Sequence, residues 1–356
     1  MKTIKINLGD RGYRVLIGGG LLRQAGALLK EACLDNGLVI ITNPMVQSLH
    51  GTEFRNRLTA GGFNVTVLTV AEGEEQKSLD TAGRLYEELT TAYTERRTAI
   101  LAMGGGVIGD LAGFVAATYL RGVPLVQVPT TLLAQVDSSI GGKVAVNHGK
   151  LKNKIGAFYQ PRVVISDIAT LKTLPAAETA NGLAEVIKCA VIKDKDLFGF
   201  LESNISRIKE EAVLEEIVYR TAGIKARVVE QDETDRGTRN LLNFGHTIGH
   251  AIETTCDFRV RHGQAVATGM ILASRVAVKM GIFKEAELKR LTKVIAAAGL
   301  SVDKPALDAK KIIQAMKHDK KVAGGRVRFV LPRAIGEAFL CEDVSLEMVE
   351  ETLNAE

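Results

Sequence analysis

The order of apolar and polar residues in the first half of the chain predicts buried strands that alternate with amphipathic helices. Near-continuous apolar runs occur at Leu38–Asn43, Asn64–Val70, Thr98–Gly106 and Leu125–Thr131. Such runs are typical of strands that are buried on both faces of a parallel sheet. Helix-period segments such as SLDTAGRLYEELTTA separate them, and the first residues, MKTIKINLGDRGYRV, alternate as a strand does. This succession of βα units predicts a parallel sheet covered by helices.

The pattern changes to long helical periods after the run VVISDIATLKTLP. These periods occupy Ala176–Lys193, Ser206–Glu230, His262–Met280 and Ala286–Ala298. A late return to β-type pattern, RVRFVLPRAIGEAFL, predicts a hairpin. We therefore predict an α/β fold with an N-terminal Rossmann-like parallel-sheet domain over residues 1–168 and a C-terminal mainly α-helical domain over residues 169–356.

Composition narrows the class of protein without naming a function. The net charge is +5, but the 46 basic and 41 acidic residues are interleaved along the chain, so the excess suits anionic small molecules at least as well as nucleic acid. Only 5% of residues are aromatic and there is no Trp, which argues against base stacking. No apolar run reaches the roughly 18 residues that a membrane-spanning helix needs, and no signal-peptide block opens the chain, so we expect a cytoplasmic protein. The four cysteines lie far apart without a CxxC, which predicts reduced, buried thiols.

A glycine-rich turn between a strand and a helix is the first candidate site. In AILAMGGGVIGDLAGFVAATYL, residues Gly104, Gly106 and Gly109 are spaced as GxGxxG. Residues without side chains let backbone N–H groups at a helix N-terminus approach a pyrophosphate. The alternative is a tight turn with no ligand, and the turn follows three earlier strands, whereas the usual dinucleotide motif lies in the first βα unit.

Polar segments that follow neighbouring strands strengthen the case for a nucleotide. EGEEQKS offers Glu74 and Lys77, and VPTTLLAQVDSSIGGK offers Thr130 and Thr131. Ligands of α/β sheets collect at the carboxyl ends of the strands, where all these segments are expected. The Gly-rich stretch GGKVAVNHGKLKNK adds four lysines suited to phosphate, Lys143, Lys150, Lys152 and Lys154.

The segment NFGHTIGHAIE places His246 and His250 four residues apart in a predicted helix, so both can face one cavity. Thr247 stands where a zinc protease of the HExxH type has its glutamate, which excludes that mechanism. A third histidine, His262, opens the next helical segment. The spacing does not decide which of His246 and His250 is a ligand.

Glu185 lies in an otherwise apolar helix, NGLAEVIKCAVIK. A carboxylate there is costly unless it is paired or coordinated. One interpretation is a salt bridge with Lys188, together with histidines that are simply satisfied at a helix junction. The other is a catalytic zinc site, because two histidines and a glutamate with one open position form its usual ligand set. Just before the histidines, Arg239 is either a clamp for phosphate or carboxylate or a solvated loop charge.

Four stretches closely resemble the 3-dehydroquinate synthase family: MGGGVIGDLAGFVAATYLRGVPLVQVPTTLLAQVDSSIGGKVAVN, LAEVIK, LNFGHTIGHAIE and HGQAVATGM. The resemblance implies an enzyme that depends on NAD and one divalent metal, Zn²⁺ or Co²⁺. It would convert 3-deoxy-D-arabino-heptulosonate 7-phosphate, a small sugar phosphate, to 3-dehydroquinate and phosphate in the shikimate pathway. Transient oxidation by NAD, phosphate elimination, re-reduction and an intramolecular aldol closure would follow one another. It also implies a homodimer, an NAD-binding first domain and a metal- and substrate-binding second domain.

The resemblance also implies roles for individual residues. The metal ligands would be Glu185, His246 and His262. NAD would be held by Glu72, Gly73, Glu74, Lys77, Gly105, Gly106, Val107, Ile108, Gly109, Asp110, Thr130, Thr131, Lys143, Lys152, Thr170, Leu171, Lys172 and Thr173. The substrate would meet Asp137, Lys143, Asn153, Lys188, Lys225, Arg239, Asn243 and His250, with His250 as a proton carrier or substrate contact. Arg121 and one of Lys320 and Lys321 would assist.

Three competing functions make different demands on these residues. A polyol dehydrogenase of the glycerol dehydrogenase type would not need Lys143, Lys152, Arg239 and Asn243 together, because its substrates lack phosphate. Other sugar-phosphate cyclases, which make inosose or valiolone rings, are expected to change some of Lys225, Arg239 and Asn243. A non-catalytic nucleotide-sensing or nucleic-acid-binding protein would leave the candidate metal ligands without purpose.

Overall fold

The computed structural model describes residues 1–34, 37–149, 151–256, 259–302, 308–318, 322–323 and 326–355. The chain forms two compact units, Met1–Pro175 with Leu214–Thr234, and Ala176–Val213 with Asp235–Glu356. The segment Leu214–Thr234 therefore packs in the first unit, although it lies beyond the domain boundary predicted at residue 168. That boundary between two functional domains stays a prediction.

The first unit is built on one seven-stranded sheet with the order β1-β2-β9-β6-β5-β3-β4. Only β1 is antiparallel to its neighbour, and the other pairs are parallel. The strands are β1 (Lys2–Ile6), β2 (Tyr13–Gly18), β3 (Leu38–Thr42), β4 (Val65–Thr69), β5 (Ala99–Gly104), β6 (Leu125–Pro129) and β9 (Val163–Asp167). The predicted strands of the first half and the strand at the start of the chain are confirmed.

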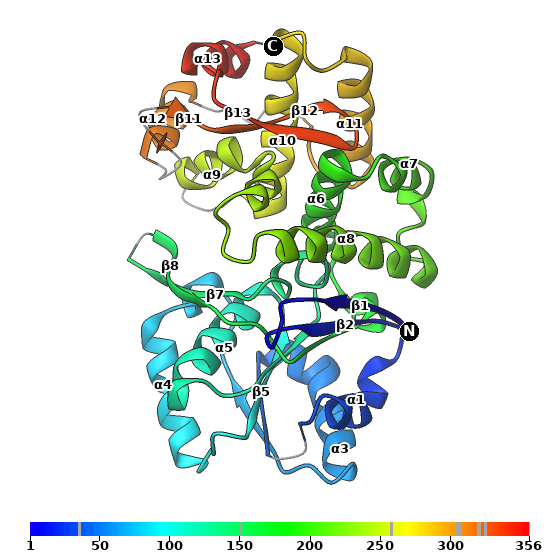
Figure 1. The fold of residues 1–356 in the computed structure, drawn as a ribbon, viewed down its shortest axis with the longest axis vertical. Coiled ribbons are helices and arrows are strands. Elements are labelled where there is room, and N and C mark those ends of the chain that lie inside the picture. The colour runs from blue at the N-terminus through cyan, green and yellow to red at the C-terminus, as the bar shows by residue number, and fades with distance from the viewer. Residues whose placement is uncertain are drawn as a thin grey trace. The chain divides into compact units, whose positions relative to one another are not determined.

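Helices cover both faces of this sheet, as Figure 1 shows for the blue and cyan part of the chain. Alternate residues of one strand enter different cores: Ile40 packs with the side chains of α1 (Ala25–Glu31) and α3 (Thr52–Ala60), whereas Ile41 packs with those of α4 (Leu79–Thr91) and α5 (Gly106–Thr118). This two-sided burial explains the continuous apolar runs. The prediction was wrong for β4, which is an edge strand and only partly buried.

The rest of the first unit is a hairpin, a long helix and short helical turns. The hairpin of β7 (Lys143–His148) and β8 (Leu151–Phe158) is antiparallel, and the lysine-rich pattern had not indicated it. The long helix is α8 (Glu211–Gln231). The short turns are η1 (Leu21–Gln24), α2 (Pro44–Val46), η2 (Gln47–Gly51), η3 (Glu74–Gln76), η4 (Tyr119–Arg121), η5 (Ala134–Ser138) and η6 (Ile168–Thr173).

The second unit is mainly helical, and α10 (His262–Lys279) packs against helices on several sides and against one hairpin. Its other elements are α6 (Ala176–Lys193), α7 (Lys195–Asn204), η7 (Ile205–Arg207), η8 (Thr238–Asn243), α9 (His246–Thr255), α11 (Glu285–Ala297), α12 (Ala309–His318), β10 (Val322–Ala323), β11 (Arg326–Val327), β12 (Phe329–Ala334), β13 (Glu337–Cys341) and α13 (Leu346–Asn354). The predicted late hairpin is β12–β13. The fold class is therefore confirmed.

The bounds of one predicted helix and the state of the cysteines can also be compared with the predictions. The predicted helix over Ser206–Glu230 is instead a short turn, η7, followed by α8 from Glu211. All four cysteines are free thiols, as predicted, but the prediction that they are buried holds only for Cys189 and Cys341, because Cys33 is exposed and Cys256 is half-buried. Among the residues that the structure describes, no helix is both long and apolar enough to cross a membrane.

Candidate active site

Glycines allow α9 and α10 to approach each other closely. A Cβ atom on Gly269 of α10 would lie 2.0 Å from the carbonyl oxygen of Gly245, and one on Gly249 of α9 would lie 3.0 Å from that of Ala265. Gly245 also has a φ of +78°, a left-handed conformation that glycine adopts without strain. Gly245, Gly249 and Gly269 therefore allow the first turn of α9, which begins with His246, to pack directly against α10.

Helices α6 and α10 meet where α10 begins. The side-chain oxygen of Asn181 accepts a hydrogen bond of 2.5 Å from the backbone N–H of Gly263, one of the N–H groups that a helix N-terminus leaves without an internal partner. A Cβ atom on Gly263 would lie 2.4 Å from the Asn181 carbonyl oxygen. Asn181 is one turn before Glu185, and Gly263 follows His262, so this contact fixes the separation of those two side chains.

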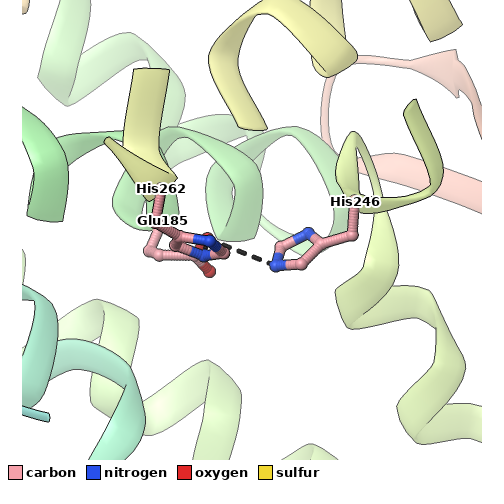
Figure 2. A group of neighbouring side chains, drawn as sticks. All are labelled: Glu185, His246 and His262. Atoms are coloured by element: carbon pink, nitrogen blue, oxygen red, sulfur yellow. Dashed lines mark ion pairs between the residues drawn. The ribbon is translucent and has the colours of Figure 1, made fainter. Parts of the chain in front are cut away.

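The side chains of Glu185, His246 and His262 converge from α6, α9 and α10 (Figure 2). The Oε1 atom of Glu185 lies 3.6 Å from Nε2 of His246 and 3.5 Å from Nε2 of His262. Zinc holds such atoms at about 2.0–2.2 Å in a tetrahedron, which places neighbouring ligand atoms about 3.3–3.6 Å apart. The spacing therefore fits one divalent metal ion.

The two oxygens of Glu185 have different surroundings. Oε2 accepts a hydrogen bond from Nζ of Lys188, and both side chains are almost completely buried. Oε1 is buried and has no hydrogen-bond partner among the described residues, which is costly unless a cation binds there. Burial by itself raises the pKa of Glu185, but Lys188 and His262 outweigh it and lower the pKa to about 2. The salt bridge with Lys188 is therefore present, and it leaves the second oxygen available as a ligand.

His262 is placed between two carboxylates. Its Nε2 faces Glu185, and its Nδ1 lies 3.4 Å from Oε2 of Glu253, a buried residue of α9. Burial disfavours the charged imidazole, but Glu185 and Glu253 together raise the pKa of His262 to about 10. The two carboxylates thus favour a positive charge at this position, which a metal ion would supply in place of the second imidazole proton.

The geometry distinguishes His246 from His250. The ring of His246 contacts Glu185, and its Nδ1 lies 3.2 Å from the carbonyl oxygen of Phe244. The His250 ring lies 5.2 Å from the His246 ring between centroids and belongs to a second possible ligand group, with Glu253 and His262. Both histidines therefore face the same region, as the spacing predicted.

Two further predicted residues of the second unit lie in η8. Arg239 is buried, with 3% of the residue exposed, so the interpretation as a solvated loop charge was wrong. Asn243 is half-buried, and its side-chain nitrogen donates to Asn240 at 3.5 Å. Lys320 and Lys321 lie outside the described residues.

In the first unit, the glycine turn occupies the carboxyl end of β5 and the start of α5. Two of its three spaced glycines have packing reasons, because a Cβ atom on Gly104 would lie 2.8 Å from Cβ of Ile108, and one on Gly109 would lie 3.0 Å from Oε1 of Gln127. Gly105 caps α5 without any side-chain hydrogen bond. The free N–H groups of this helix start fit a phosphate group of NAD.

The β7–β8 hairpin is joined to the segment EGEEQKS beside this turn. The backbone N–H of Asn147 donates to the Lys77 carbonyl at 2.8 Å, and its side chain donates to Glu74 at 2.9 Å. The buried Lys77 ammonium contacts the side chains of Asp110 on α5 and Asn153 on β8. Burial raises the pKa of Asp110, and Lys77 opposes that rise. Three of the predicted cofactor segments are thereby brought together.

The loops after β6 and β9 are joined by Gln135, which the sequence analysis missed. Its side-chain nitrogen donates to the carbonyls of Pro129 and Asp167 and to the Thr170 hydroxyl, at 3.0 to 3.3 Å. His50 contacts the hydroxyl of Thr173 at 2.9 Å, a second missed residue. The predicted stretch from Thr170 to Thr173 forms the turn η6 at this edge of the sheet.

The remaining predicted residues lie at several places in the first unit. Lys225 of α8 donates to the carbonyl and the carboxylate of Asp137. Thr130 is buried, donating its N–H to the Gly104 carbonyl at 2.9 Å, and Thr131 is half-buried. Exposed positions are held by Glu72, Gly73, Glu74, Arg121, Lys143, Asn153, Lys172 and Thr173, whereas Lys152 is half-buried.

Glu253 is the residue of the second unit that the sequence analysis missed. Its signal was present, because His246, His250 and Glu253 are spaced i, i+4 and i+7, which places all three on one face of a helix. A buried acid on that face needs a partner for the same reason as Glu185.

Models of one family match both halves of the chain. The model described as 3-dehydroquinate synthase N-terminal matches residues 67–181, and the one described as 3-dehydroquinate synthase C-terminal matches residues 182–322. A curated 3-dehydroquinate synthase of Dehalococcoides mccartyi is 53% identical over 97% of this chain and 96% of its own.

Two solved structures have the same fold. A 2-epi-5-epi-valiolone synthase from Streptomyces hygroscopicus, with NAD⁺ and Zn²⁺ bound, gives a TM-score of 0.89 at 29% identity over 96% of both chains. A 2-deoxy-scyllo-inosose synthase in complex with carbaglucose-6-phosphate, NAD⁺ and Co²⁺ gives a TM-score of 0.89 at 28% identity over 99% of both chains.

Proposed function

Because the chain belongs to the 3-dehydroquinate synthase family, we propose that Glu185, His246 and His262 hold the divalent metal of that enzyme. The reaction converts 3-deoxy-D-arabino-heptulosonate 7-phosphate to 3-dehydroquinate and phosphate. It is a phosphate lyase and cyclase reaction that depends on NAD and on Zn²⁺ or Co²⁺. The observation that carries the assignment of ligands is the buried Oε1 atom of Glu185, without a hydrogen-bond partner and 3.5–3.6 Å from two imidazole nitrogens.

When bound, NAD accepts and returns a hydride, and the metal acts as a Lewis acid toward substrate oxygens. Lys188 keeps Glu185 anionic and oriented through its contact with Oε2. His250 stands beside His246, at 5.2 Å between ring centroids, and is not needed as a ligand of this set. We assign to it the transfer of a proton to or from the substrate, a role for which an imidazole is suited near neutral pH.

The substrate phosphate and carboxylate call for cationic and amide donors. In the second unit we assign this role to Arg239, Asn243 and Lys188, because a buried guanidinium binds planar oxyanions through paired N–H groups. In the first unit, the resemblance assigns substrate contacts to Asp137, Lys143, Asn153 and Lys225. The pair of Lys225 and Asp137 holds both side chains at defined positions before substrate binds.

NAD binding is assigned to the first unit. The N-terminus of α5, from Gly105 to Asp110, supplies backbone N–H groups for the pyrophosphate. Around it stand the remaining cofactor residues, Glu72, Gly73, Glu74, Lys77, Thr130, Thr131, Lys143, Lys152 and the turn Thr170–Thr173. All but the hairpin lysines follow the carboxyl ends of parallel strands, where dinucleotides bind in such sheets.

Metal removal tests the assignment of the reaction. Protein that has been stripped with a chelator should release no phosphate from 3-deoxy-D-arabino-heptulosonate 7-phosphate in the presence of NAD. Added Zn²⁺ or Co²⁺ should restore the release. Full activity in demonstrably metal-free protein would overturn the proposal.

Rival cyclase activities are tested by the choice of substrate. Identity to the dehydroquinate synthase of D. mccartyi is 53%, against 28–29% to the inosose and valiolone synthases. The sugar phosphates of those two reactions should therefore release little phosphate. The family also favours a homodimer, which analytical ultracentrifugation would test through the mass of the particle.

A further inference from the structure

Glu253 has no role in the reaction as described so far, although it is buried beside a metal ligand. We propose that Glu253 is a positioning residue, which holds the His262 ring so that Nδ1 carries a proton and Nε2 is left as the metal ligand. The inference rests on the proposed metal site.

The contacts of the two ring nitrogens of His262 support this role of Glu253. Its ring has a carboxylate at each nitrogen: Glu253 Oε2 lies 3.4 Å from Nδ1, and Glu185 Oε1 lies 3.5 Å from Nε2. A neutral imidazole has one N–H donor and one lone pair. Glu253, which only accepts hydrogen bonds when ionised, would keep the N–H at Nδ1 when a metal replaces the proton on Nε2, so that the Nε2 lone pair is the one directed toward Glu185 and His246. Carboxylates that accept a hydrogen bond from a ligating histidine have this effect in metal sites generally.

The burial of Glu253 supports this positioning role. Only 5% of Glu253 is exposed, and it lies on the same helix face as His246. A buried carboxylate is strongly disfavoured unless charged or polar groups compensate it. Helix α9 thus provides one ligand, His246, and supports a second ligand, His262, that belongs to α10.

The same atoms offer a competing arrangement. His250, Glu253 and His262 also come within ligand distance of one another, with His262 contributing to either group. If that group bound the metal, Glu253 would be a ligand itself. We favour the first arrangement for two reasons. Oε1 of Glu185 is a buried oxygen without a hydrogen-bond partner among the described residues, and it lies 3.5–3.6 Å from an imidazole nitrogen of both His246 and His262.

A measurement of metal affinity distinguishes the two arrangements and does not depend on catalytic activity. Apo protein would be titrated with Co²⁺ in competition with a chelator, and the Co²⁺ absorption bands recorded. Glu253→Gln should bind Co²⁺ about 10–100-fold more weakly than the wild type, the usual cost of losing such a support. Glu285→Gln, on the exposed start of α11, is the matched control and should bind like the wild type. His246→Ala should lose binding altogether, whereas His250→Ala should keep it.

Two results would overturn the inference. One is wild-type affinity in Glu253→Gln. The other is loss of binding in both Glu253→Gln and His250→Ala while His246→Ala still binds, because that would make Glu253 a ligand. If wild-type protein binds no Co²⁺ or Zn²⁺ at all, the proposed function fails instead, so the two failures are distinguishable.

Histidine tautomers test the same point in wild-type protein, independent of how a variant folds. The chain has six histidines, and ¹⁵N-histidine labelling reports which ring nitrogen of each carries a proton. On binding Zn²⁺, two rings should become metal-bound through Nε2 and keep their protons on Nδ1. A ring that binds through Nδ1 would contradict the role of Glu253.

Discussion

The proposed cofactor-binding edge of the first unit and the proposed metal centre of the second unit are built in opposite ways. At the sheet edge, the positions follow from backbone topology: parallel strands β5 and β6 end in register, Gly104 opposite Pro129, and each delivers a loop to the same edge. At the metal centre, three helices each contribute one side chain, and their positions depend on how closely the helices pack. We therefore expect small changes of side-chain volume to disturb the helix-built site more than the sheet edge.

The same residue type serves each region differently. Gly105 leaves the N–H groups at the start of α5 open to a ligand, whereas Gly249 and Gly269 remove the side chains that would keep α9 and α10 apart. The carboxylates differ as well. Lys77 compensates Asp110 within the first unit, whereas Glu185 contacts Lys188 through one oxygen and is proposed to bind the metal through the other. The comparison implies that each region can be damaged while the other still binds its ligand.

The largest effect is expected for Glu185→Gln. It removes the proposed anionic ligand and its charge pair with the buried Lys188, so we expect metal binding to be lost and phosphate release to fall at least about 10³-fold, equivalent to about 4 kcal/mol. NAD binding, measured by calorimetry, should change little. Loss of NAD affinity together with metal affinity would show that the two regions are not independent.

Lys77→Met tests the reverse case, in which NAD binding in the first unit is damaged while metal binding in the second unit is kept. It leaves the half-buried Asp110 carboxylate without the Lys77 ammonium, which should cost about 1–3 kcal/mol of the free energy of unfolding and should further raise the pKa of Asp110. Chemical denaturation should show the loss, and NAD affinity should fall. Co²⁺ affinity of the folded fraction should match the wild type, and a parallel drop would count against independent regions.

A single methyl group at Gly249 tests the helix contact. A Cβ atom there would lie 3.0 Å from the Ala265 carbonyl oxygen, so Gly249→Ala should destabilise the protein by about 1–3 kcal/mol and weaken metal binding. The control is Gly199→Ala in α7, where a Cβ atom meets nothing within 4 Å. That change should stabilise by up to about 1 kcal/mol. Equal effects at both positions would refute the packing explanation.

The smallest effect is expected at His50. Removal of its hydrogen bond to Thr173 in His50→Ala should cost about 0.5–1.5 kcal/mol, seen as a few-fold loss of NAD affinity. A double-mutant cycle with Thr173→Val separates this contact from side effects. Additive losses would show that the two residues do not act together.

The sequence predicted the topology-defined region better than the packing-defined one. Apolar runs located β3, β5 and β6, and strand ends located the cofactor loops, because period and burial are local properties. The edge position of β4 and the hairpin of β7 and β8 could not be predicted, since strand order is set by partners distant in the chain. The short turn η7, which replaces the start of a predicted helix, reflects the low precision of helix boundaries in sequence patterns.

For the proposed metal centre, the residue spacing indicated which side chains share a site but not which of them bind the metal. Periodicity placed His246 and His250 on one face, yet only the packing of α9 against α10 shows that the rings of His246 and His262 meet at Glu185. Glu253 was visible in the same spacing and was overlooked. The burial of Arg239 depends on tertiary packing, so the sequence left its role open.

The proposed function requires a redox cycle that closes within one turnover, with NAD recycled. The direct measurement is the number of phosphates released from 3-deoxy-D-arabino-heptulosonate 7-phosphate per NAD, with metal present and NAD far below the substrate concentration. We predict many phosphates per NAD and no accumulation of NADH. One phosphate or fewer per NAD, or NADH that rises in step with phosphate, would contradict the account.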